Sequence, residues 1–192
     1  MKRKVLVFAL LVGFAFSVFA QNVSDFQYTQ NSSGIMITGY TGSVKDVRIP
    51  DRINNLPVVV IKNSAFSRKQ LTSITLPNSI IYIGMFAFLE NQLTSITFPN
   101  SLIYIGERAF MNNRLTSITF PNSFLHIEKN AFRNNQLTSI TFPNSPNLIY
   151  IGVGAFVENR LTSVVVPSGC LFFPNSFDDN VRRTNESGEY WQ

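Results

Sequence analysis

The chain has 192 residues, of which 45% are hydrophobic and 14% are charged, and its formal net charge is +5. Its single cysteine, Cys170, excludes an intramolecular disulfide and a metal cluster built from several cysteines. Three of the 16 basic residues are Lys2, Arg3 and Lys4, so the chain after residue 20 holds 13 basic and 11 acidic residues, a net charge of +2. This near-neutral balance gives no electrostatic reason to expect a nucleic acid partner.

The first 20 residues have the order of a secretory signal peptide. Three basic residues precede an apolar run, and the small Ala20 stands before the polar Gln21 and Asn22. We expect cleavage after Ala20; an uncleaved N-terminal anchor is the alternative, although the apolar run is short for a membrane span. Export would place the mature chain in a periplasm, on the outer surface or outside the cell. The longest later apolar stretch, 80–89, is interrupted by Gly84, so we expect no membrane span after cleavage.

Residues 21–43 are expected to form an N-terminal cap. Within them, segment 26–42 shows two short alternating runs around an Asn-Ser-Ser-Gly turn at 31–34, which predicts a β-hairpin. Segment 44–66 follows, and it carries the Pro and Ala-Phe marks that recur later in the chain. We interpret it as a first, longer turn of a repeat domain.

A nine-residue sequence recurs through the rest of the chain. It reads LTSITLPNS at 71–79, LTSITFPNS at 93–101, 115–123 and 137–145, and LTSVVVPSG at 161–169. The copies start 22, 22, 22 and 24 residues apart. A fixed period in the twenties predicts a solenoid whose turns stack. We place the repeat domain at 44–180, with repeats that start near 44, 71, 93, 115, 137 and 161.

Each copy contains the strand spacing of leucine-rich repeats. Apolar residues such as Leu93, Ile96 and Phe98 are expected to enter the core, and the residues between them point outward because strand side chains alternate. The outward positions form a row of hydroxyl groups: Ser73, Thr75, Ser95, Thr97, Ser117, Thr119, Ser139 and Thr141. This hydroxyl face is a candidate binding surface. The alternative is that Thr at these positions simply suits a β-ladder.

Three further columns complete each turn. Proline at 77, 99, 121, 143 and 167 lacks a backbone donor and marks the end of each strand. Serine at 79, 101, 123 and 145 is expected to hydrogen-bond the turn. Each turn ends in Ala-Phe, which places five rings in one buried column: Phe66, Phe88, Phe110, Phe132 and Phe156. No long 3.6-residue apolar stripe is present, so we expect little helix.

The C-terminal segment 170–180 imitates the second half of a repeat. Phe177 falls in the phenylalanine column, and Asn180 falls in the column of four earlier asparagines, at 91, 113, 135 and 159. Charged residues accumulate after this segment. We therefore expect residues 181–192 to form a frayed tail.

The pattern LTSITxPNSxxxIGxxAF, together with the N-terminal YTG and LPV elements, resembles the BspA-like, treponemal-type leucine-rich repeats of bacterial cell-surface proteins. The resemblance covers residues 26–180. It implies a β-rich, right-handed solenoid of five to six turns, with β-structure on more than one side and a function in adhesion or protein binding. It carries over no catalytic residue, because the family has no catalytic motif to transfer.

The chain departs from that family just before the Ile-Gly pair of each turn, where relatives usually carry Thr and Ser. Here these positions form an apolar band: Ile81, Tyr82, Ile103, Tyr104, Leu125, His126, Ile149 and Tyr150. The band either fills the solenoid interior or lies exposed, and an exposed band would mark an interface. The glycine of the pair is replaced by Lys62 and Glu128, so these sites need no glycine-only backbone conformation.

Few residues are suited to catalysis or to metal binding. His126 is the only histidine, and no second acid joins Glu128 in its column, so we interpret it as a tyrosine substitute. One histidine without a cysteine partner cannot supply the converging ligands of a metal site. For Asp178 and Asp179 we favour solvated charges at the C-terminal cap over a weak Ca²⁺ site, which is the alternative. We expect no enzyme activity, no cofactor and no metal.

The sequence thus predicts an exported, non-enzymatic module that binds a protein of a host or of the cell envelope through one face of the stack. A structural alternative is homo-oligomeric assembly of the same chain through the apolar band, with no external ligand. A carbohydrate-binding module is a third class, and it would need exposed aromatic platforms with polar neighbours.

Overall fold

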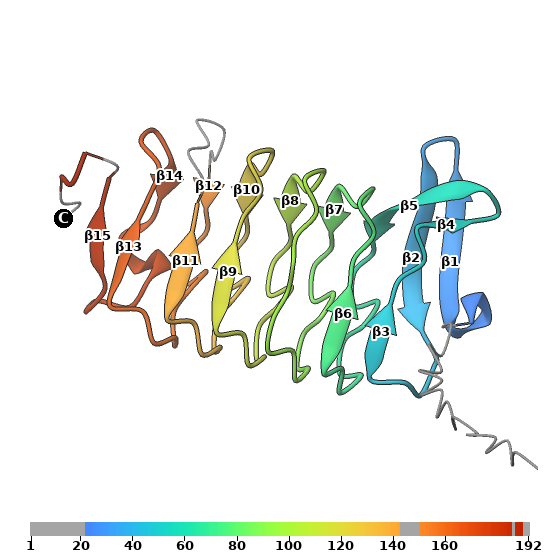
Figure 1. Cartoon of the computed structure of the whole chain (residues 1–192). Helices are drawn as coiled ribbons and strands as arrows, with labels where there is room; N and C mark the ends of the chain where they lie inside the picture. Colours follow the sequence, from blue (N-terminus) through green and yellow to red (C-terminus); the bar gives the residue numbers. More distant parts are fainter. Residues whose placement is uncertain (1–21, 143–149, 186, 190–192) are drawn as a thin grey trace, which may run out of the picture.

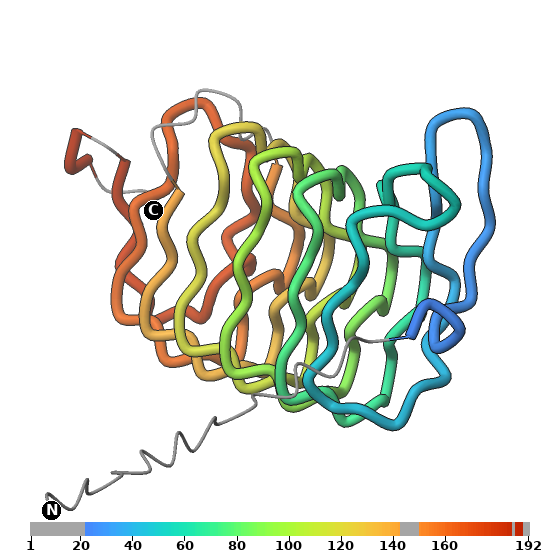
Figure 2. The backbone as a smooth tube through the Cα atoms, turned by 45° about the vertical axis from the view of Figure 1, so that its right-hand side comes forward, coloured from blue at the N-terminus to red at the C-terminus, as the bar shows by residue number. Residues whose placement is uncertain are grey.

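The chain forms an elongated β-solenoid of about six turns (Figure 1). The computed structural model describes residues 22–142, 150–185 and 187–189; the candidate signal peptide and Ile149 lie outside them. Figure 2 shows that successive turns lie over one another, as the 22-residue period predicts. Among the described residues the helical segments are two short 3-10 helices, Val23–Asp25 and Pro174–Ser176. The predictions of a repeat solenoid and of little helix are confirmed.

A β-hairpin caps the N-terminal end, as the sequence predicts. Strands β1 (Phe26–Asn31) and β2 (Gly34–Tyr40) pair antiparallel, and β2 continues in parallel with β5 (Leu56–Ile61). Gly34 opens the second strand at a φ of 141°, and a Cβ there would lie 2.5 Å from the carbonyl oxygen of Pro57. Only glycine fits such a close approach. The hairpin therefore covers the first turn of the stack.

One side of the solenoid is a continuous sheet of nine strands. Its order is β1-β2-β5-β7-β8-β10-β12-β14, with the short β4 (Arg52–Ile53) paired to β5. The strands that follow β5 are parallel and in register: β7 (Tyr82–Ile83), β8 (Tyr104–Ile105), β10 (His126–Ile127), β12 (Tyr150–Ile151) and β14 (Leu171–Phe172). Each repeat thus adds one rung of two residues.

A second side carries the hydroxyl positions, and its sheet is interrupted. Six strands form three separate parallel pairs: β3 (Asp46–Arg48) with β6 (Ser73–Thr75), β9 (Ser117–Thr119) with β11 (Ser139–Thr141), and β13 (Ser163–Val165) with β15 (Arg182–Thr184). Within residues 22–142, Ser95–Thr97 pairs with neither neighbouring strand. The expected row of hydroxyl groups is therefore not carried by one sheet.

Strand β15 corrects the expectation of a frayed tail from residue 181 onward. Arg182–Thr184 pairs in register with Ser163–Val165, and the N–H of Val166 donates to the carbonyl of Thr184 at 2.8 Å. The open edge of β13 offers unpaired backbone groups, which the following segment satisfies. The charged side chains of this segment therefore do not prevent it from continuing the ladder.

A third side holds the phenylalanine column and consists of bends. The residues two before and two after each of the five rings from Phe66 to Phe156 have left-handed φ values, as in Phe86 (58°) and Glu90 (54°). Between turns, the N–H groups donate toward the C-terminal end, for example from Phe88 to the carbonyl of Ala109 at 2.8 Å. At that end the carboxylate of Asp178 accepts from the N–H groups of Glu158 (3.1 Å) and Asn159 (3.3 Å). Asp178 is thus an acceptor that caps this ladder.

The core is a set of parallel columns, which confirms the central prediction from the repeats. Neighbouring rings of the phenylalanine column stack with centroids 5.0 to 5.4 Å apart, and all are buried: Phe66, Phe88, Phe110, Phe132, Phe156 and Phe177. The serine column also has its expected role, because Ser101 Oγ donates to the carbonyls of Asn78 (2.7 Å) and Ile80 (2.6 Å).

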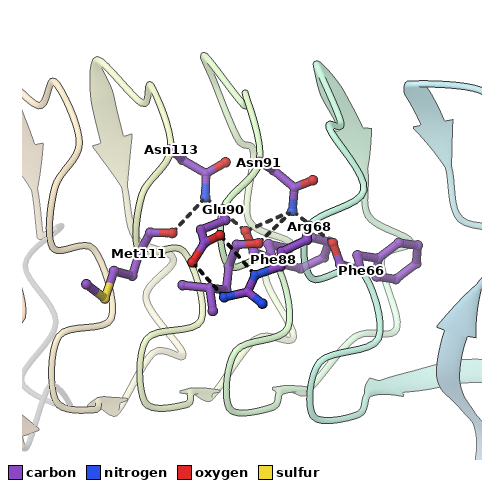
Figure 3. A network of polar contacts seen from close by, with 8 residues as sticks. Phe66, Arg68, Phe88, Glu90, Asn91, Met111 and Asn113 are labelled. Atoms are coloured by element: carbon purple, nitrogen blue, oxygen red, sulfur yellow. Dashed lines mark hydrogen bonds and ion pairs between the residues drawn. The ribbon is translucent and has the colours of Figure 1, made fainter.

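A ladder of asparagines ties the turns together next to the phenylalanine column (Figure 3). Asn91 Nδ2 donates to the carbonyls of Phe66 (2.8 Å) and Phe88 (2.9 Å), and its Oδ1 accepts from the N–H of Leu71 at 2.9 Å. Asn113, Asn135 and Asn159 repeat this arrangement in later turns. Asn180, which the repeat pattern assigns to the same column, is exposed.

Candidate interaction face

The two-residue strands of the continuous sheet place one side chain inward and the next outward. Ile83, Ile105, Ile127 and Ile151 point inward and are fully buried. Their neighbours Tyr82, Tyr104, His126 and Tyr150 lie on the outer surface and are half-buried. This alternation is the ordinary consequence of strand geometry. The aromatic column of the apolar band therefore lines the outside of the sheet and does not fill the core.

The outer rings stack on one another along the axis of the solenoid. Ring centroids are 4.6 Å apart for Tyr82 and Tyr104, 5.2 Å for Tyr104 and His126, and 4.4 Å for His126 and Tyr150. Phe173 meets Tyr150 edge-on at 6.1 Å and ends the row. Each ring thus covers the face of the next, and the ring edges and polar tips are what a partner would meet.

Aliphatic residues border this aromatic column on the surface. Ile81 is 42% exposed and Ile103 is 41% exposed, and Leu125 is half-buried. Their backbones join the ladder, since the N–H of Ile103 donates to the carbonyl of Ile81 at 3.0 Å. We call this surface the aromatic face: Ile81, Tyr82, Ile103, Tyr104, Leu125, His126 and Tyr150. Of the two interpretations of the apolar band, the described residues fit the exposed one.

A carboxylate is inserted at the border of the aromatic face. Glu128 Oε1 accepts a hydrogen bond from the hydroxyl of Tyr104 at 3.0 Å and lies 3.1 Å from His126 Nε2. Burial raises the pKa of the Tyr104 hydroxyl above its usual value, and the hydrogen bond to Glu128 raises it further. The cluster fixes the orientation of two adjacent rings. Among the described residues, no group of three or more His, Cys, Asp or Glu could hold a metal ion.

The hydroxyl face differs in shape from the aromatic face. Seven of its eight residues are exposed; Ser73 is half-buried and donates to a carboxylate oxygen of Asp46. Grooves of about 550 and 390 Å³ lie on either side of the unpaired segment Ser95–Thr97. The structure thus places the predicted hydroxyl groups on one side, but it separates them by grooves instead of joining them in a flat row.

Sequence reasoning missed the role of Glu128 in this site. It identified the residue as a replacement for the repeat glycine and as the single acid near His126, without a contact to Tyr104. The contact with Tyr104 spans 24 residues and arises because the 22-residue period sets Glu128 beside Gly106, which follows β8 by one residue. The alignment of the repeats therefore contained a clue to this contact, because Glu128 is the one acidic residue in the glycine column beside the aromatic rings.

The architecture and the repeat columns define a leucine-rich-repeat protein. A family model for the BspA type leucine rich repeat region matches residues 59–181, in six copies. The chain therefore belongs to the BspA-type leucine-rich-repeat family. No curated protein matches the chain.

Solved structures of bacterial leucine-rich-repeat proteins are similar to this chain. The T. pallidum leucine-rich-repeat protein TpLRR is 28% identical, with a TM-score of 0.54 over 73% of this chain and 90% of its own. A leucine-rich-repeat protein from Bacteroides capillosus is 26% identical, with a TM-score of 0.54 over 64% of this chain and 98% of its own. A leucine-rich cell surface protein from Faecalibacterium prausnitzii, 17% identical, shares the fold with a TM-score of 0.56 over 88% of this chain and 59% of its own.

Proposed function

We propose that this chain is an exported leucine-rich-repeat module that binds a host protein or an envelope protein through the aromatic face. The observation that carries the proposal is a column of stacked, half-exposed aromatic rings bordered by exposed isoleucines on a continuous sheet. Aromatic side chains held rigid by their neighbours lose little entropy on binding, and they are enriched at the centres of protein interfaces. The leucine-rich-repeat fold commonly serves protein–protein interaction.

The same ring geometry favours a protein over a carbohydrate. A sugar ring packs on the open face of an aromatic side chain, but Tyr82 and Tyr104 lie 4.6 Å apart with an interplanar angle of 3°. Their faces therefore cover each other. The edges, hydroxyl groups and isoleucine side chains that remain exposed suit the mixed apolar and polar surface of a protein.

Export and surface exposure are part of the proposal. They are supported by the signal-peptide pattern of residues 1–20 and by the similar Faecalibacterium protein described as a cell surface protein. None of the helices in the described part of the chain has the length and hydropathy to cross a bilayer. We infer a role in adhesion or in contact between envelope proteins, without catalysis.

The test is a double substitution on the aromatic face, Ile103→Ser with Tyr104→Ala. The matched control is Ser117→Ala with Thr119→Ala on the hydroxyl face. We expect the first variant to lose at least about ten-fold in affinity for proteins retained from envelope or host-surface extracts, as truncation of central interface residues does. The control should bind as the unaltered chain does. Unchanged binding by a folded Ile103→Ser/Tyr104→Ala variant would reject the aromatic face as the site.

A second candidate function, self-assembly, is supported by the C-terminal end of the sheet. Strand β14 ends the sheet, Leu171 is 62% exposed, and Phe173 beside it is 39% exposed. An open apolar strand edge is a template for pairing with another chain. Light scattering over a concentration series separates the two functions, because a mass that stays monomeric at high concentration excludes assembly.

A further inference from the structure

A slot runs beside the aromatic face where the repeat places glycine. It has a volume of about 240 Å³ and is lined by Asn63, Tyr82, Met85, Tyr104, Gly106, Glu107 and Glu128. We call this cavity the glycine slot.

The slot exists because side chains are missing from one column. A Cβ on Gly106 would lie 2.7 Å from the backbone carbon of Gly84, so side chains in this column point back over the preceding turn. Glu128 shows the direction, since its carboxylate reaches back to the Tyr104 hydroxyl. Glycine at 106 leaves the equivalent space beside Tyr104 without a side chain of this column, whereas at Gly84 the amide oxygen of Asn63 lies 2.5 Å from where a Cβ would stand. Neither glycine has a positive φ, so close approach and not backbone conformation explains these residues.

Both charged groups that line the slot are acidic. One carboxylate oxygen of Glu128, Oε1, serves both Tyr104 and His126, and within the described part of the chain Oε2 accepts no hydrogen bond. Among the described residues, the ion pair of Glu107 is with its chain neighbour Arg108, at 3.6 Å. Lys62 stands in the glycine column itself, one turn before Gly84, and Lys129 directly follows Glu128, but neither lysine lines the slot. The slot therefore favours a cationic occupant and disfavours an anionic one.

We propose that the glycine slot receives a lysine or arginine side chain of the protein partner. The methylene groups of such a side chain would lie over the glycine backbone, between the tyrosine edges and Met85. Its charged group would donate to the free oxygen of Glu128. Long basic side chains bury their stems along apolar surface while the charge is paired at the tip. A hard metal ion is a poorer fit, because it needs about six oxygen ligands and the slot offers two carboxylates.

This inference rests on the proposed function and names the chemistry of the partner: a protein surface with a basic side chain among apolar ones. The aromatic face supplies apolar contact area, and the slot at its border favours partners that carry a positive charge there. Tyr82 and Tyr104 belong to both surfaces, so a partner that packs on the aromatic face would bring a neighbouring basic residue directly over the slot.

The test uses Nα-acetyl-lysine amide and Nα-acetyl-arginine amide as probes, with neutral Nα-acetyl-norleucine amide as the control compound. Each is titrated into the isotope-labelled chain while backbone amide resonances are recorded. We expect saturable shifts of the Gly84, Met85 and Gly106 amides with either basic probe and none that saturate with the neutral one. In Glu128→Gln the basic probes should bind about ten-fold more weakly or worse, the usual loss for a hydrogen bond to a charged group.

Two matched variants make the result specific. Glu90→Gln removes an exposed carboxylate on the third side and should leave probe binding unchanged. Glu107→Gln lowers the negative charge of the slot without touching the Tyr104 hydrogen bond, so it should weaken binding even if Glu128→Gln fails to fold. Equal shifts with the neutral probe, or full binding in both slot variants, would overturn the proposal. The probes report on the slot alone. The proposal for the slot can therefore fail while the aromatic face still binds its partner, and the two results are distinguishable.

Discussion

The aromatic face and the hydroxyl face are built by the same repeats, yet only the first is a continuous sheet. On the aromatic face, every turn from β5 to β14 pairs with the next. On the hydroxyl face the strands form three separate pairs, and Ser95–Thr97 pairs with neither neighbour among the described residues. The ring spacings of the two sides overlap: the outer rings of the aromatic face lie 4.4 to 5.2 Å apart, and the rings beneath the hydroxyl face lie 5.6 Å (Phe98 and Phe120) and 5.1 Å (Phe120 and Phe142) apart.

A glycine column accompanies the continuous sheet, although Lys62 and Glu128 occupy the same column without interrupting it. Gly84, Gly106 and Gly152 directly follow the strands of the aromatic face, and a Cβ on any of them would lie 2.5 to 2.7 Å from atoms of the neighbouring turn. Consecutive turns therefore approach closely there. On the hydroxyl face the same Ser-Ile-Thr sequence pairs at β9 and β11 but not at Ser95–Thr97. We therefore expect the aromatic face, whose ladder is continuous, to be the more rigid of the two surfaces.

The largest predicted effect concerns the scaffold that both faces share. Asn113→Ala would leave the buried N–H of Leu93 and the carbonyls of Phe88 and Phe110 without their side-chain partner. We expect a loss of about 3 kcal/mol in the free energy of unfolding, measured by denaturant titration. Asn100→Ala, at an exposed position outside the left-handed backbone region, is the control and should cost less than about 0.5 kcal/mol. Equal losses in the two variants would contradict the structural role of the ladder.

Amide hydrogen exchange measures the contrast between the faces directly. The N–H groups of Ile103 and Gly106 donate to Ile81 and Ile83 at 3.0 and 2.8 Å, whereas Ser95–Thr97 is in no strand. We expect the amides of Ile96 and Thr97 to exchange at least about 100-fold faster than those of Ile103 and Gly106, because exchange reports local opening. Similar protection on both sides would show that the hydroxyl face is also a closed ladder.

A smaller effect is expected from the titration of Tyr104. Its pKa in the folded chain is raised by burial and by Glu128, so above pH about 10 the unfolded chain releases this proton first. The contribution of Tyr104 to stability is therefore complete below that pH and is lost as the pH rises further. As the pH rises from 9 to 11, the free energy of unfolding should fall less in Tyr104→Phe than in the unaltered chain. From pH 6 to 8 the free energies of unfolding of the two chains, measured by denaturant titration, should change with pH in the same way. A difference of the opposite sign above pH 10 would contradict this assignment.

The sequence allowed the columns of the fold to be predicted. It did not predict which of two identical segments forms a strand, because that depends on the geometry of the neighbouring turn. The 22-residue period placed the phenylalanine stack and the serine hydrogen bonds correctly, and the alternating runs around the turn at 31–34 placed the hairpin cap. Residues 93–101 and 115–123 have the same sequence, yet only the second forms a strand, because pairing depends on the distance to the neighbouring turn. Strand β15 carries no repeat mark and was therefore missed.

The candidate site was predictable as a set of residues but not as a surface. The apolar column alignment identified Tyr82, Tyr104 and Tyr150, and two-residue strands then decided which side chain of each pair points outward. An apolar pair such as Tyr-Ile does not by itself show which member faces solvent. The bond between Glu128 and Tyr104 also depends on a contact between turns that local sequence does not display.

The most direct test of the account is photo-crosslinking in the cells that make the chain, from one position on each face. A benzophenone amino acid replaces Ile103 on the aromatic face or Thr119 on the hydroxyl face, both of which are exposed. The account predicts a covalent adduct with a partner protein from position 103 and none from position 119. An adduct from position 119 alone, or equal adducts from both positions, would contradict the claim that recognition belongs to the aromatic face.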